Sequence, residues 1–593
     1  MTTTGITLAA SAVNAKLIGG SREAKLLVRE TLSYLVDGAQ YSQAFKGTSW
    51  DGRSSFFDFN SGTFPAGFLY KVQAKLLKAG YRVNVVRNPA PAPLGPERPE
   101  VDDFGYDPRY SYQPEVADKL IKHRQIIARV ATGGGKSRIA RICYKRIGRK
   151  TLFLTTRGIL LYQMADAVES NLKETAGIIG DSKWDGSRQF TAGMVQTLAQ
   201  AVELWTEEGE MLAYLKNRDA AEDREVEKLA GRLKKQGLKA VEISAATVTL
   251  RKTLEAQRPS DAQVVADIQA KVREHNARRD KVIEWLKTIE FVILEEAHEV
   301  SGEGFYQLMR HCTNAHYRLA LTATPFMKDS PEANLRLEAC SGPVAITVTE
   351  KQLIDLGVLA TPYFKFIALQ NHAPQYQTEV KGKVFTHRLF RSTPWPKCYE
   401  VGIVNNDERN HAIVYEVARA AKHGLRAMVL VGRKEHGKRL TELLTAAGVR
   451  CNFIFGEHDQ KERQAALNAL RVDRIDCVIG STILDVGVDV PAAGLIVLAG
   501  GGKAEVQTRQ RIGRGLRAKK FGPNVAFVVD FIEANNQTLR DHQNERIAII
   551  KNTPGFAENV VPDFDYSAFG LGESVYAQSF STASARPLAV STN

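Results

Sequence analysis

The sequence predicts an α/β protein with two tandem doubly wound parallel-sheet domains behind a small N-terminal α/β domain. Short apolar strands alternate with helical segments over residues 105–345, and the same alternation resumes over 346–555. A Gly-rich segment that opens a helix follows an early strand of the first series only. The 593 residues are also too many for a single hydrophobic core.

The N-terminal domain is expected over residues 1–88. Leucines 26, 27, 32 and 35 lie near helical spacing and predict a helix over 21–36. A second helix is expected over 68–77, with Gly80 separating it from a strand over 81–86. Residues 89–104 are Pro-rich, so we expect an extended interdomain linker that joins no core.

In the first parallel-sheet domain, strands are expected at 126–130, 151–154, 291–294 and 319–321. Residues 203–287 interrupt the pattern with charged amphipathic segments, which predict a helical hairpin inserted between two strands. Ser260 and Gln263 have the spacing of a capping box within it. This insertion is either a structural decoration with a solvated face or an arm that contacts DNA or a partner.

The second domain has strands expected at 427–431, 476–479, 495–498 and 525–529. Residues 556–593 show no periodicity and end in Ser, Thr and Ala, so a flexible tail is expected there.

Composition narrows the class of protein. No apolar run reaches the length of a membrane span, and the N-terminus lacks the basic segment of a secretory signal. The six cysteines form no Cys-x-x-Cys pair, which favours reduced, mostly buried thiols in a cytoplasm over zinc or disulfides. The net charge of +14 favours a polyanionic partner such as nucleic acid, although a solubility effect is the alternative.

The Gly-rich segment runs Ala-Thr-Gly-Gly-Gly-Lys-Ser over residues 131–137. Backbone N–H groups in such a loop can cradle phosphates, and the segment includes Thr132 and three glycines (Gly133, Gly134 and Gly135). Lys136 is expected on the β/γ-phosphates and Ser137 on a metal ion. Val130 stands where the strict Walker pattern has its first Gly.

Two carboxylates, Glu295 and Glu296, end the apolar run over 291–294. We expect Glu295 to hold Mg²⁺ through water and Glu296 to take a proton from the attacking water. Together with the Gly-rich segment, this pair predicts hydrolysis of a nucleoside triphosphate with Mg²⁺. His298 is expected to link the nucleotide to Thr322 and Thr324, which follow another apolar strand.

The second domain carries the run Gln510-Arg511-Ile512-Gly513-Arg514-Gly515-Leu516-Arg517. Arg514 and Arg517 stand three apart and, on a helix, would share one face that meets the γ-phosphate across an interdomain cleft. A solvated helix face is the alternative. Upstream, Gly487 and Asp489 are expected in a nucleotide-facing loop, and Gln113 could select the adenine base.

This ordered set resembles superfamily 2 helicases and translocases over about residues 105–535, which implies two RecA-like domains. The resemblance assigns ATP contacts to Gln113, to the phosphate loop (residues 131–137), to Gly487 and Asp489 (motif five), and to Gln510, Arg514 and Arg517 (motif six). It assigns the motif-two and motif-three roles to residues 295–298 and 322–324. It implies nucleic-acid contacts at Thr155, Thr156, Arg157, Gln196, Thr197, Gly432, Arg433, Ser481 and Thr482. Glu295 stands where the family usually has Asp.

Within the superfamily the chain resembles the UvsW-type phage recombination helicases, near the XPB type. The segment Trp50-Asp51-Gly52-Arg53, His436-Gly437-Lys438 and the short spacing between motifs two and three carry this likeness. It implies that the N-terminal domain binds duplex DNA through Trp50, Arg53 and basic side chains (Lys46, Lys71 and Lys75). A tight turn stapled by Trp50 is the alternative for the Trp50 segment.

The resulting hypothesis is an ATP- and Mg²⁺-dependent DNA helicase or translocase in the cytoplasm, or in the host cytoplasm if the gene is a phage's. It would act as a monomer on duplex, forked or four-way-junction DNA, in branch migration and fork regression, beside single-strand-binding or recombination proteins. The alternatives are an RNA helicase, the translocating subunit of a restriction or defence complex, and an ATP-gated DNA clamp.

Overall fold

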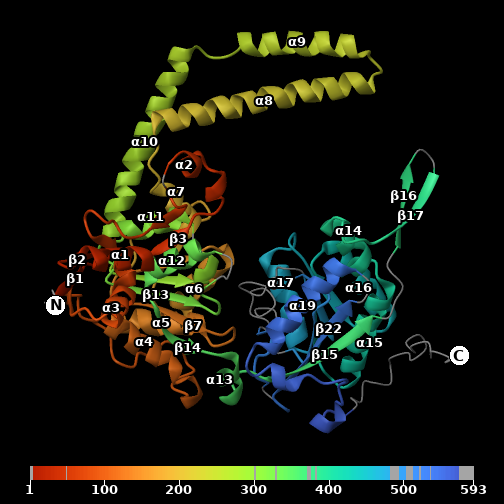
Figure 1. Cartoon of the computed structure of the whole chain (residues 1–593). Helices are drawn as coiled ribbons and strands as arrows, with labels where there is room; N and C mark the ends of the chain where they lie inside the picture. The colour runs from red at the N-terminus through yellow and green to blue at the C-terminus, as the bar shows by residue number, and fades with distance from the viewer. Residues whose placement is uncertain are drawn as a thin grey trace.

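The computed structural model describes residues 5–48, 50–299, 302–326, 330–369, 375–380, 383–480, 493–502, 512–513, 515–519, 522–533 and 536–572. These residues form an N-terminal domain and two larger α/β domains, with a helical arm projecting from the first of the larger pair (Figure 1). Among the described residues, no helix is long and apolar enough to cross a membrane.

The N-terminal domain is a four-stranded sheet of order β5-β2-β1-β6 with two helices. Its main elements are β1 (Ile6–Ala10), β2 (Asn14–Ile18), α1 (Arg22–Thr31), β5 (Thr63–Pro65), α3 (Leu69–Lys78) and β6 (Val83–Arg87). Between α1 and β5 lie β3 (Ser33–Leu35), α2 (Gln43–Gly47) and β4 (Arg53–Ser55).

Helix α1 is shorter than expected. It ends at Thr31 because the backbone continues into β3, which pairs with β4. Of the four leucines expected on one face, Leu32 is buried and Leu27 packs against the core, whereas Leu26 and Leu35 are exposed. Ala24 and Val28 complete the buried face of the helix.

The N-terminal domain packs directly on helix α12 (Pro331–Ser341) of the next domain. Lys71 Nζ lies 2.6 Å from Glu338 Oε2, and the Tyr34 hydroxyl donates to Glu332 Oε1 at 2.8 Å. A Cβ at Gly67 would lie 2.1 Å from the Glu338 carbonyl oxygen, so the two backbones are in close contact. Lys71 is therefore engaged within the protein, in contrast to its expected role on phosphates.

The Pro-rich segment over 89–104 was expected to join no core, and this was wrong. Leu94 N–H donates to Ile147 O at 3.0 Å, and Gly95 N–H donates to Arg146 O at 3.1 Å. Val101 is 1% exposed within the core of the first large domain. The residues between the prolines retain N–H groups, and these fasten the extended chain along the end of a helix.

The first large domain is an eight-stranded sheet of order β10-β9-β11-β8-β12-β13-β7-β14. The strands are β7 (Gln125–Val130), β8 (Thr151–Thr155), β9 (Ala176–Gly180), β10 (Lys183–Trp184), β11 (Phe190–Met194), β12 (Phe291–Glu295), β13 (Tyr317–Thr322) and β14 (Val344–Val348). All neighbours are parallel except β10 and β9. Because β8, β12 and β13 are buried along their whole length, their sequences are continuous apolar runs.

Helices α4 (Tyr112–His123), α5 (Lys136–Ile147), α6 (Gly158–Leu172), α7 (Val195–Ala201) and α11 (Glu303–His311) accompany this sheet. Strand β14 spans the expected domain boundary at 345/346 and belongs to the first sheet. Helix α13 (Glu350–Asp355) follows it, and its Leu353 packs beside the loop after β7, where a Cβ at Gly134 would lie 3.2 Å from Leu353 Cδ1. The crossing to the second large domain therefore comes after α13.

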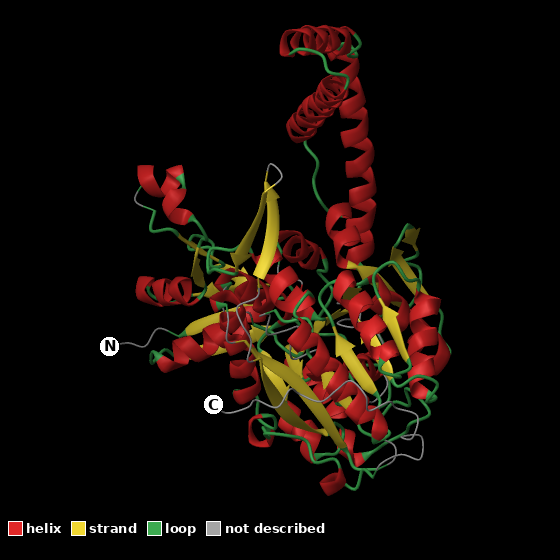
Figure 2. Ribbon diagram, turned by 90° about the vertical axis from the view of Figure 1, so that its right-hand side faces the viewer, coloured by secondary structure: helices red, strands yellow, loops and turns green. Residues whose placement is uncertain are grey.

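The insertion contains three helices instead of the expected hairpin. Helices α8 (Glu207–Lys235) and α9 (Ala240–Ala256) form an antiparallel pair that α10 (Asp261–Lys287) carries away from the body (Figures 1 and 2). Ser260 caps α10 as expected, because its side chain accepts from Gln263 N–H at 3.3 Å. The Gln263 side chain, however, donates to Asp267 at 2.8 Å, so it does not complete the capping box.

The second large domain is a parallel six-stranded sheet of order β15-β22-β21-β18-β20-β19. The strands are β15 (Thr361–Leu369), β18 (Ala427–Leu430), β19 (Cys451–Ile454), β20 (Cys477–Gly480), β21 (Leu495–Val497) and β22 (Val525–Glu533). Its helices include α14 (Trp395–Tyr399), α15 (Asp407–Lys422), α16 (Lys434–Ala446), α17 (Gln460–Arg471) and α19 (Gln537–Lys551), and a hairpin is formed by β16 (Gln375–Val380) and β17 (Lys383–Arg388).

Part of the expected C-terminal tail is packed on this domain. Phe556, Phe564 and Tyr566 are at most 2% exposed, and Val561 N–H donates to Phe364 O at 2.8 Å. The aromatic residues were missed because they occur singly among polar residues and show no period. Residues 573–593 lie outside the described chain.

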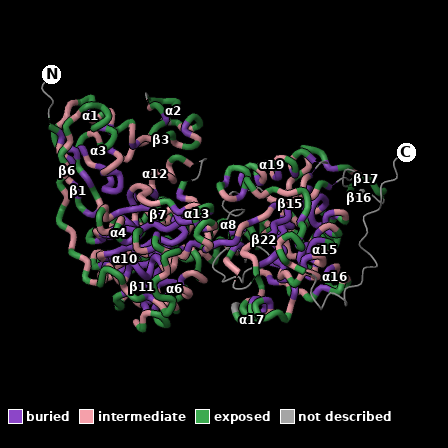
Figure 3. Tube along the Cα trace, turned by 90° about the horizontal axis from the view of Figure 1, so that it is seen from below, coloured by how far each residue is buried: buried purple, intermediate pink, exposed green. Residues whose placement is uncertain are grey.

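Buried residues gather in the interior of each large domain, as the view from below shows (Figure 3). All six cysteines are free thiols, and all but Cys451 are buried, as their spacing predicted. The tandem parallel sheets confirm the predicted fold class.

Candidate ATP and nucleic-acid site

The loop between β7 and α5 is shaped by its glycines. Gly133 and Gly135 have positive φ angles of 88° and 77°, which side chains rarely adopt. A Cβ at Gly134 would lie 2.6 Å from Val130 Cγ1, so the strand residue that replaces the usual Gly also restricts this position. The loop then turns directly into α5, where free N–H groups of a helix N-terminus favour phosphate.

Gln113 lies beside this loop, buried to 1% exposure. Its amide Nε2 donates to Gly134 O at 3.3 Å, and its Oε1 accepts from Arg138 at 2.7 Å. The Tyr112 hydroxyl also donates to Gly134 O, at 2.8 Å. In this structure Gln113 therefore contacts the phosphate loop, whereas the sequence argument considered only the adenine edge.

Asp102, at the end of the Pro-rich segment, completes this support and was missed from sequence. It accepts from Arg138 Nε at 2.9 Å and from Arg141 Nη2 at 3.0 Å. Burial acts to raise the pKa of Asp102, but hydrogen bonds from the two arginines outweigh it and hold the pKa below its usual value. An Asp in an acidic stretch after prolines carries no sequence signal for this role.

Ser137 and Glu295 meet across the edge of the sheet. The Ser137 hydroxyl donates to Glu295 Oε1 at 3.2 Å, which joins the first turn of α5 to the end of β12. Hydroxyl and carboxylate oxygens are hard ligands, and Mg²⁺ in phosphate sites takes only one or two protein ligands of this kind. The buried Thr132 hydroxyl has no hydrogen-bond partner among the described residues. These donors fit an Mg²⁺–nucleotide complex.

Glu296 faces the phosphate-loop lysine. Lys136 Nζ lies 3.3 Å from Glu296 Oε1, and both side chains are 10% exposed. Glu296 has φ of 49°, a left-handed conformation that costs a non-Gly residue about 1–2 kcal/mol. This backbone turn directs two successive carboxylates to different partners, Glu295 to Ser137 and Glu296 to Lys136.

His298 connects the second carboxylate to the end of the neighbouring strand. Its Nδ1 lies 2.9 Å from Thr322 Oγ1 and 3.4 Å from Glu296 Oε2. Thr324 N–H donates to Thr322 Oγ1 at 3.2 Å, so both threonines belong to this chain of contacts. Burial lowers the pKa of His298 although Glu296 acts to raise it, which favours a neutral ring at neutral pH.

The second large domain touches the phosphate loop. A Cβ at Gly513 would lie 2.8 Å from Thr132 Cβ, and one at Gly133 would lie 2.6 Å from Leu359 Cδ2. Gly513 and Leu359 therefore reach the loop from the second domain and from the crossing before it. The described residue Gly513 of the 510–517 run is thus placed next to the phosphate site.

Arg517 does not lie on a helix. It forms an antiparallel bridge with Leu359, and the preceding carbonyl, Leu516 O, accepts from Ala360 N–H at 2.6 Å. The expectation that Arg514 and Arg517 share one helical face was wrong for Arg517, because pairing with the incoming strand ends the helix at that point. Arg517 is exposed.

Six predicted residues lie outside the described chain, so the structure does not place them. They are Ser481, Thr482, Gly487, Asp489, Gln510 and Arg514.

The residues predicted to contact nucleic acid in the first domain converge on Glu299. Its carboxylate accepts from the Thr156 hydroxyl and from Arg157, at 2.6 Å for Arg157 Nη2. Burial acts to raise the pKa of Glu299, and hydrogen bonds from Arg157 and Thr156 outweigh it, so the pKa lies below its usual value. Glu299 follows His298 closely, and its contacts were missed because only the carboxylates at 295 and 296 end a strand.

The remaining first-domain candidates lie nearby. The exposed Gln196 donates from Nε2 to Thr156 O at 3.5 Å, Thr197 follows on α7, and Thr155 is fully buried at the end of β8. The Thr155 side chain supports the backbone of this segment, because its Oγ1 accepts from Arg157 N–H at 3.3 Å.

Gly432 and Arg433 stand at the end of β18 and contact Tyr399. A Cβ at Gly432 would lie 2.2 Å from the Tyr399 hydroxyl oxygen, so only Gly fits. The Arg433 guanidinium lies 4.8 Å from the centre of the Tyr399 ring and donates to Pro396 O at 3.2 Å. Helix α14, which contains Pro396 and Tyr399, therefore holds the side chain of Arg433, one of the residues predicted to contact nucleic acid.

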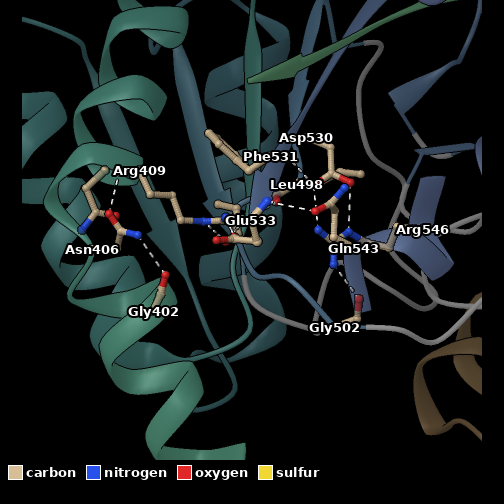
Figure 4. Close-up of polar contacts among 12 residues, drawn as sticks. Gly402, Asn406, Arg409, Leu498, Gly502, Asp530, Phe531, Glu533, Gln543 and Arg546 are labelled. Carbon is tan, nitrogen blue, oxygen red and sulfur yellow. Dashed lines mark hydrogen bonds and ion pairs between the residues drawn. The ribbon is translucent and has the colours of Figure 1, made fainter. Parts of the chain in front are cut away.

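A buried ionic network underlies the edge of the second sheet (Figure 4). Arg409, fully buried, pairs with Glu533 and donates to Ala499 O at 3.0 Å. Arg546 pairs with Asp530 through two hydrogen bonds of 2.9 and 3.0 Å and donates to Gly502 O at 2.8 Å. Both arginines thus hold the backbone over 499–502, which leads toward the 510–517 run.

Trp50 has a local structural role. Its Nε1 donates to Arg53 O at 2.7 Å, and Asp51 Oδ1 accepts from Arg53 N–H at 3.0 Å. These contacts favour the stapled-turn alternative for Trp50, while the Arg53 side chain remains exposed.

Two family profiles match the chain. Residues 107–327 match "Type III restriction enzyme, res subunit", and residues 408–519 match "Helicase conserved C-terminal domain". With the parallel sheets and the loop–carboxylate geometry, these matches identify the two large domains as the tandem RecA-like domains of a superfamily 2 helicase.

Within this superfamily, the chain is similar to several named proteins. It is 23% identical over 258 residues to "Putative helicase 22" of Sulfolobus islandicus filamentous virus (43% of this chain, 44% of the relative). It is 25% identical over 232 residues to "Putative DNA 3'-5' helicase Rad25" of Halobacterium salinarum (38% and 34%). It is 21% identical over 253 residues to "ATP-dependent DNA helicase uvsW" of Enterobacteria phage T4 (42% and 47%). The matched segments span less than half of each relative.

Among solved structures, a crystal structure of T4 UvsW aligns with a TM-score of 0.40 at 16% identity, covering 94% of this chain and 98% of that one.

Proposed function

We propose that the chain is an ATP- and Mg²⁺-dependent DNA helicase or translocase that remodels branched DNA by branch migration and fork regression. The observation that carries the proposal is the pairing of Lys136 with Glu296 and of Ser137 with Glu295 at one edge of the first sheet. This brings a phosphate-binding lysine and a candidate base together in a site with little solvent.

Each residue has a definite task in this proposal. Lys136 and the loop N–H groups bind and orient the triphosphate, and Glu296 accepts the proton of the attacking water. Ser137 and Glu295 would hold Mg²⁺, which when bound neutralises charge that develops on the phosphates. Arg514 and Arg517 would approach from the second domain as arginine fingers, and Gly487 and Asp489 would line the same nucleotide. Gln113 would read the adenine edge while it supports the loop.

Coupling to DNA follows from the contacts beyond the carboxylates. Glu296 reaches Thr322 through His298, and Glu299 holds Thr156 and Arg157. His298 and Glu299 are neighbours in the chain, so a change at the nucleotide that moves His298 would also move Glu299 and the residues proposed for the phosphate backbone. That set comprises Thr155, Thr156, Arg157, Gln196, Thr197, Gly432, Arg433, Ser481 and Thr482.

The net charge of +14 favours a nucleic acid, and the preference for DNA rests on the names of two relatives, which specify DNA helicases. Exposed basic residues of the N-terminal domain, Lys46, Arg53 and Lys75, would contact duplex phosphates. A second candidate is the translocating subunit of a restriction or defence complex, since the first profile bears the name of such a subunit.

The deciding experiment measures ATPase rate with single-stranded DNA, duplex, four-way junction and RNA in parallel. Branch migration of a labelled junction is followed in the same samples, with Glu296→Gln as the inactive control. Stimulation by junction and duplex above RNA, together with ATP-dependent migration, is expected. ATPase activity stimulated by RNA alone, or by DNA without junction movement, would contradict the branched-DNA proposal.

A further inference from the structure

The arm of α8, α9 and α10 is firmly packed where α8 leaves α10. Val264, Ile268 and Val272 on α10 pack with Trp205, Met211 and Tyr214. The Trp205 ring stacks on His275 with centroids 3.8 Å apart, and its backbone exchanges two hydrogen bonds with the Asn276 side chain, of 3.2 and 3.0 Å. The arm is therefore a stiff projection instead of a loose insertion.

Along the shaft, charges are paired between helices. Arg251 of α9 lies 2.7 Å from Asp223 of α8, and Arg258 binds Glu222 through two hydrogen bonds of 2.9 and 2.7 Å. These pairs fix the antiparallel register of α8 and α9, and they also engage acidic side chains of the shaft.

The tip, residues 229–241, has the opposite character. Its sequence contains four basic residues and no acidic one, and all four are exposed: Arg232, Lys234, Lys235 and Lys239. None of the four has a carboxylate within salt-bridge distance in the described part of the chain. The tip is therefore purely basic, whereas the shaft carries acidic and basic residues together, some of them paired.

Helix capping accounts for part of this charge only. Arg232, Lys234 and Lys235 lie in the last turn of α8, where cations favour the helix dipole. The dipole amounts to about half a charge, so three cations exceed what it can compensate. Lys239 stands at the N-cap of α9, where a positive charge opposes the dipole. Glu242 supplies an anion at that N-terminus, where its carboxylate accepts from Lys239 N–H at 2.8 Å. Helix capping therefore does not account for the four cations of the tip.

The position of the arm suits a long polyanion. Helix α7, which carries Gln196 and Thr197, contacts the lower part of α10, and α8 leaves α10 partway along its length to extend over the space between the two large domains (Figures 1 and 3). With 29 residues, α8 spans about 43 Å, slightly more than one turn of B-form DNA.

We propose that the arm tip binds the phosphate backbone of duplex DNA about one helical turn away from the motor. This inference rests on the proposed function, because it adds a second contact to a duplex already held by the motor domains. The contact is sequence-independent and strongly dependent on salt, since lysines act on phosphates as point charges.

The test compares two triple variants of the full chain with equal changes in charge. The tip variant is Lys234→Glu/Lys235→Glu/Lys239→Glu. The shaft control is Lys252→Glu/Lys271→Glu/Arg273→Glu, three exposed cations that are likewise unpaired in the described chain. Affinity for 15-bp and 50-bp duplexes is measured by fluorescence anisotropy over a range of salt concentrations.

The tip variant is expected to bind the 50-bp duplex at least about tenfold more weakly at 0.1 M salt, with a log–log salt slope reduced by about 2–3. Binding to the 15-bp duplex is expected to stay at the wild-type level, and the shaft control is expected to match wild type on both. DNA-independent ATPase activity should be equal in all three proteins, which verifies folding. A photo-crosslinker at Gln236 should label the 50-bp duplex.

The opposite results are equally clear. A tip variant that binds both duplexes like wild type, or that binds the 50-bp duplex no more weakly than the shaft control does, overturns the inference. Crosslinking from Gln236 to protein alone, or a tip-dependent change in sedimentation without DNA, would assign the tip to a second copy or an acidic protein instead. Failure of the wild type to bind either duplex would contradict the proposed function itself.

Discussion

The Lys136 ammonium lies 3.3 Å from the Glu296 carboxylate, in a region where each side chain is only 10% exposed. The phosphate loop and the strand that ends in the candidate base are therefore in direct electrostatic contact. Because Lys136 can satisfy either Glu296 or a phosphate, nucleotide binding and the orientation of the base are linked. The backbone at Glu296 is left-handed, with φ of 49°. This conformation allows Glu296 to contact Lys136 while the preceding Glu295 contacts Ser137.

Lys136→Ala and Glu296→Gln should separate binding from hydrolysis. Lys136→Ala is expected to weaken ATP binding by about 10–100-fold, because a charged hydrogen bond to phosphate is lost. Glu296→Gln should bind ATP and DNA yet hydrolyse about 10²–10⁴-fold more slowly, because no carboxylate takes the proton. Equilibrium binding and single-turnover hydrolysis measure these effects. The control is Lys145→Ala, which removes a lysine from the far end of the same helix and should behave as wild type. If Glu296→Gln hydrolysed ATP at the wild-type rate, Glu296 would not be the base.

Arg514→Ala and Arg517→Ala are each expected to slow hydrolysis by about 10³–10⁵-fold with little change in ATP affinity. The reason is that an arginine finger stabilises charge that develops only in the transition state. Arg474→Ala, an exposed arginine of the same domain, serves as the control. If Arg517→Ala slowed hydrolysis only several-fold, the role of residue 517 would be its backbone bridge to Leu359. The substitution leaves that bridge intact because it changes only the side chain.

Arg409→Met should destabilise the second large domain by about 3–5 kcal/mol, because it leaves Glu533 buried without its partner. Burial already raises the pKa of Glu533 against the effect of Arg409. The double variant Arg409→Met/Glu533→Met should recover most of the loss, which thermal unfolding can measure. If the double variant were as unstable as the single one, the hydrogen bonds of Arg409 to the backbone over 498–499 would be the dominant contribution.

His436 predicts a specific loss of stability in acid. The Asn410 amide donates to Val404 O at 3.0 Å, so its Oδ1 faces His436 Nε2 at 2.9 Å and fixes a neutral ring with the proton on Nε2. Burial lowers the pKa of His436 to about 3. The unfolded chain, with an ordinary pKa near 6.5, therefore binds the proton first as pH falls.

Stability is thus complete above about pH 6.5 and decreases by up to about 1.4 kcal/mol per pH unit below it, until the folded pKa is reached. His436→Gln can still donate to Asn410 but cannot gain a proton. Its second domain should be less stable than wild type at pH 7.5, yet lose less on transfer to pH 5. Hydrogen exchange of the β18 amides provides the measurement, and parallel losses in both proteins would contradict the assignment.

Gly67→Val should separate the N-terminal domain from α12, because its Cβ would meet the Glu338 carbonyl oxygen at 2.1 Å. We expect a lower melting temperature and new protease cleavage within 89–104, since Ala339 and Tyr306 pack against the N-terminal core. Gly47→Ala, where a Cβ meets no atom within 4 Å, is the matched control. Wild-type stability of Gly67→Val would show that the domain is an independent module, as the linker composition suggested.

Junction binding should also fall in Gly67→Val if the N-terminal domain presents Arg53 and Lys75 to DNA in a fixed orientation. Comparing it with deletion of residues 1–88 separates the loss of orientation from the loss of the contacts themselves.

Much of the central architecture was visible in the sequence because buried parallel strands need continuous apolar runs. Strands β7, β8, β12 and β13 all lie where those runs predicted them. The phosphate loop was equally visible, since positive φ angles at Gly133 and Gly135 require glycine. Ser137 and Glu295 were assigned to one metal ion and His298 was expected to link to Thr322, and in the structure both pairs are in contact.

What the sequence by itself determined is therefore the set of strands, the loop and the carboxylates, because each depends on local geometry or on burial of both sheet faces. Only the tertiary structure decided which face of α1 is buried, that Arg517 bridges Leu359, and that the Pro-rich segment and the chain to residue 572 are packed. These features depend on a partner distant in sequence. A local pattern shows that a residue can pack or pair, but the partner that removes it from water exists only in the folded chain.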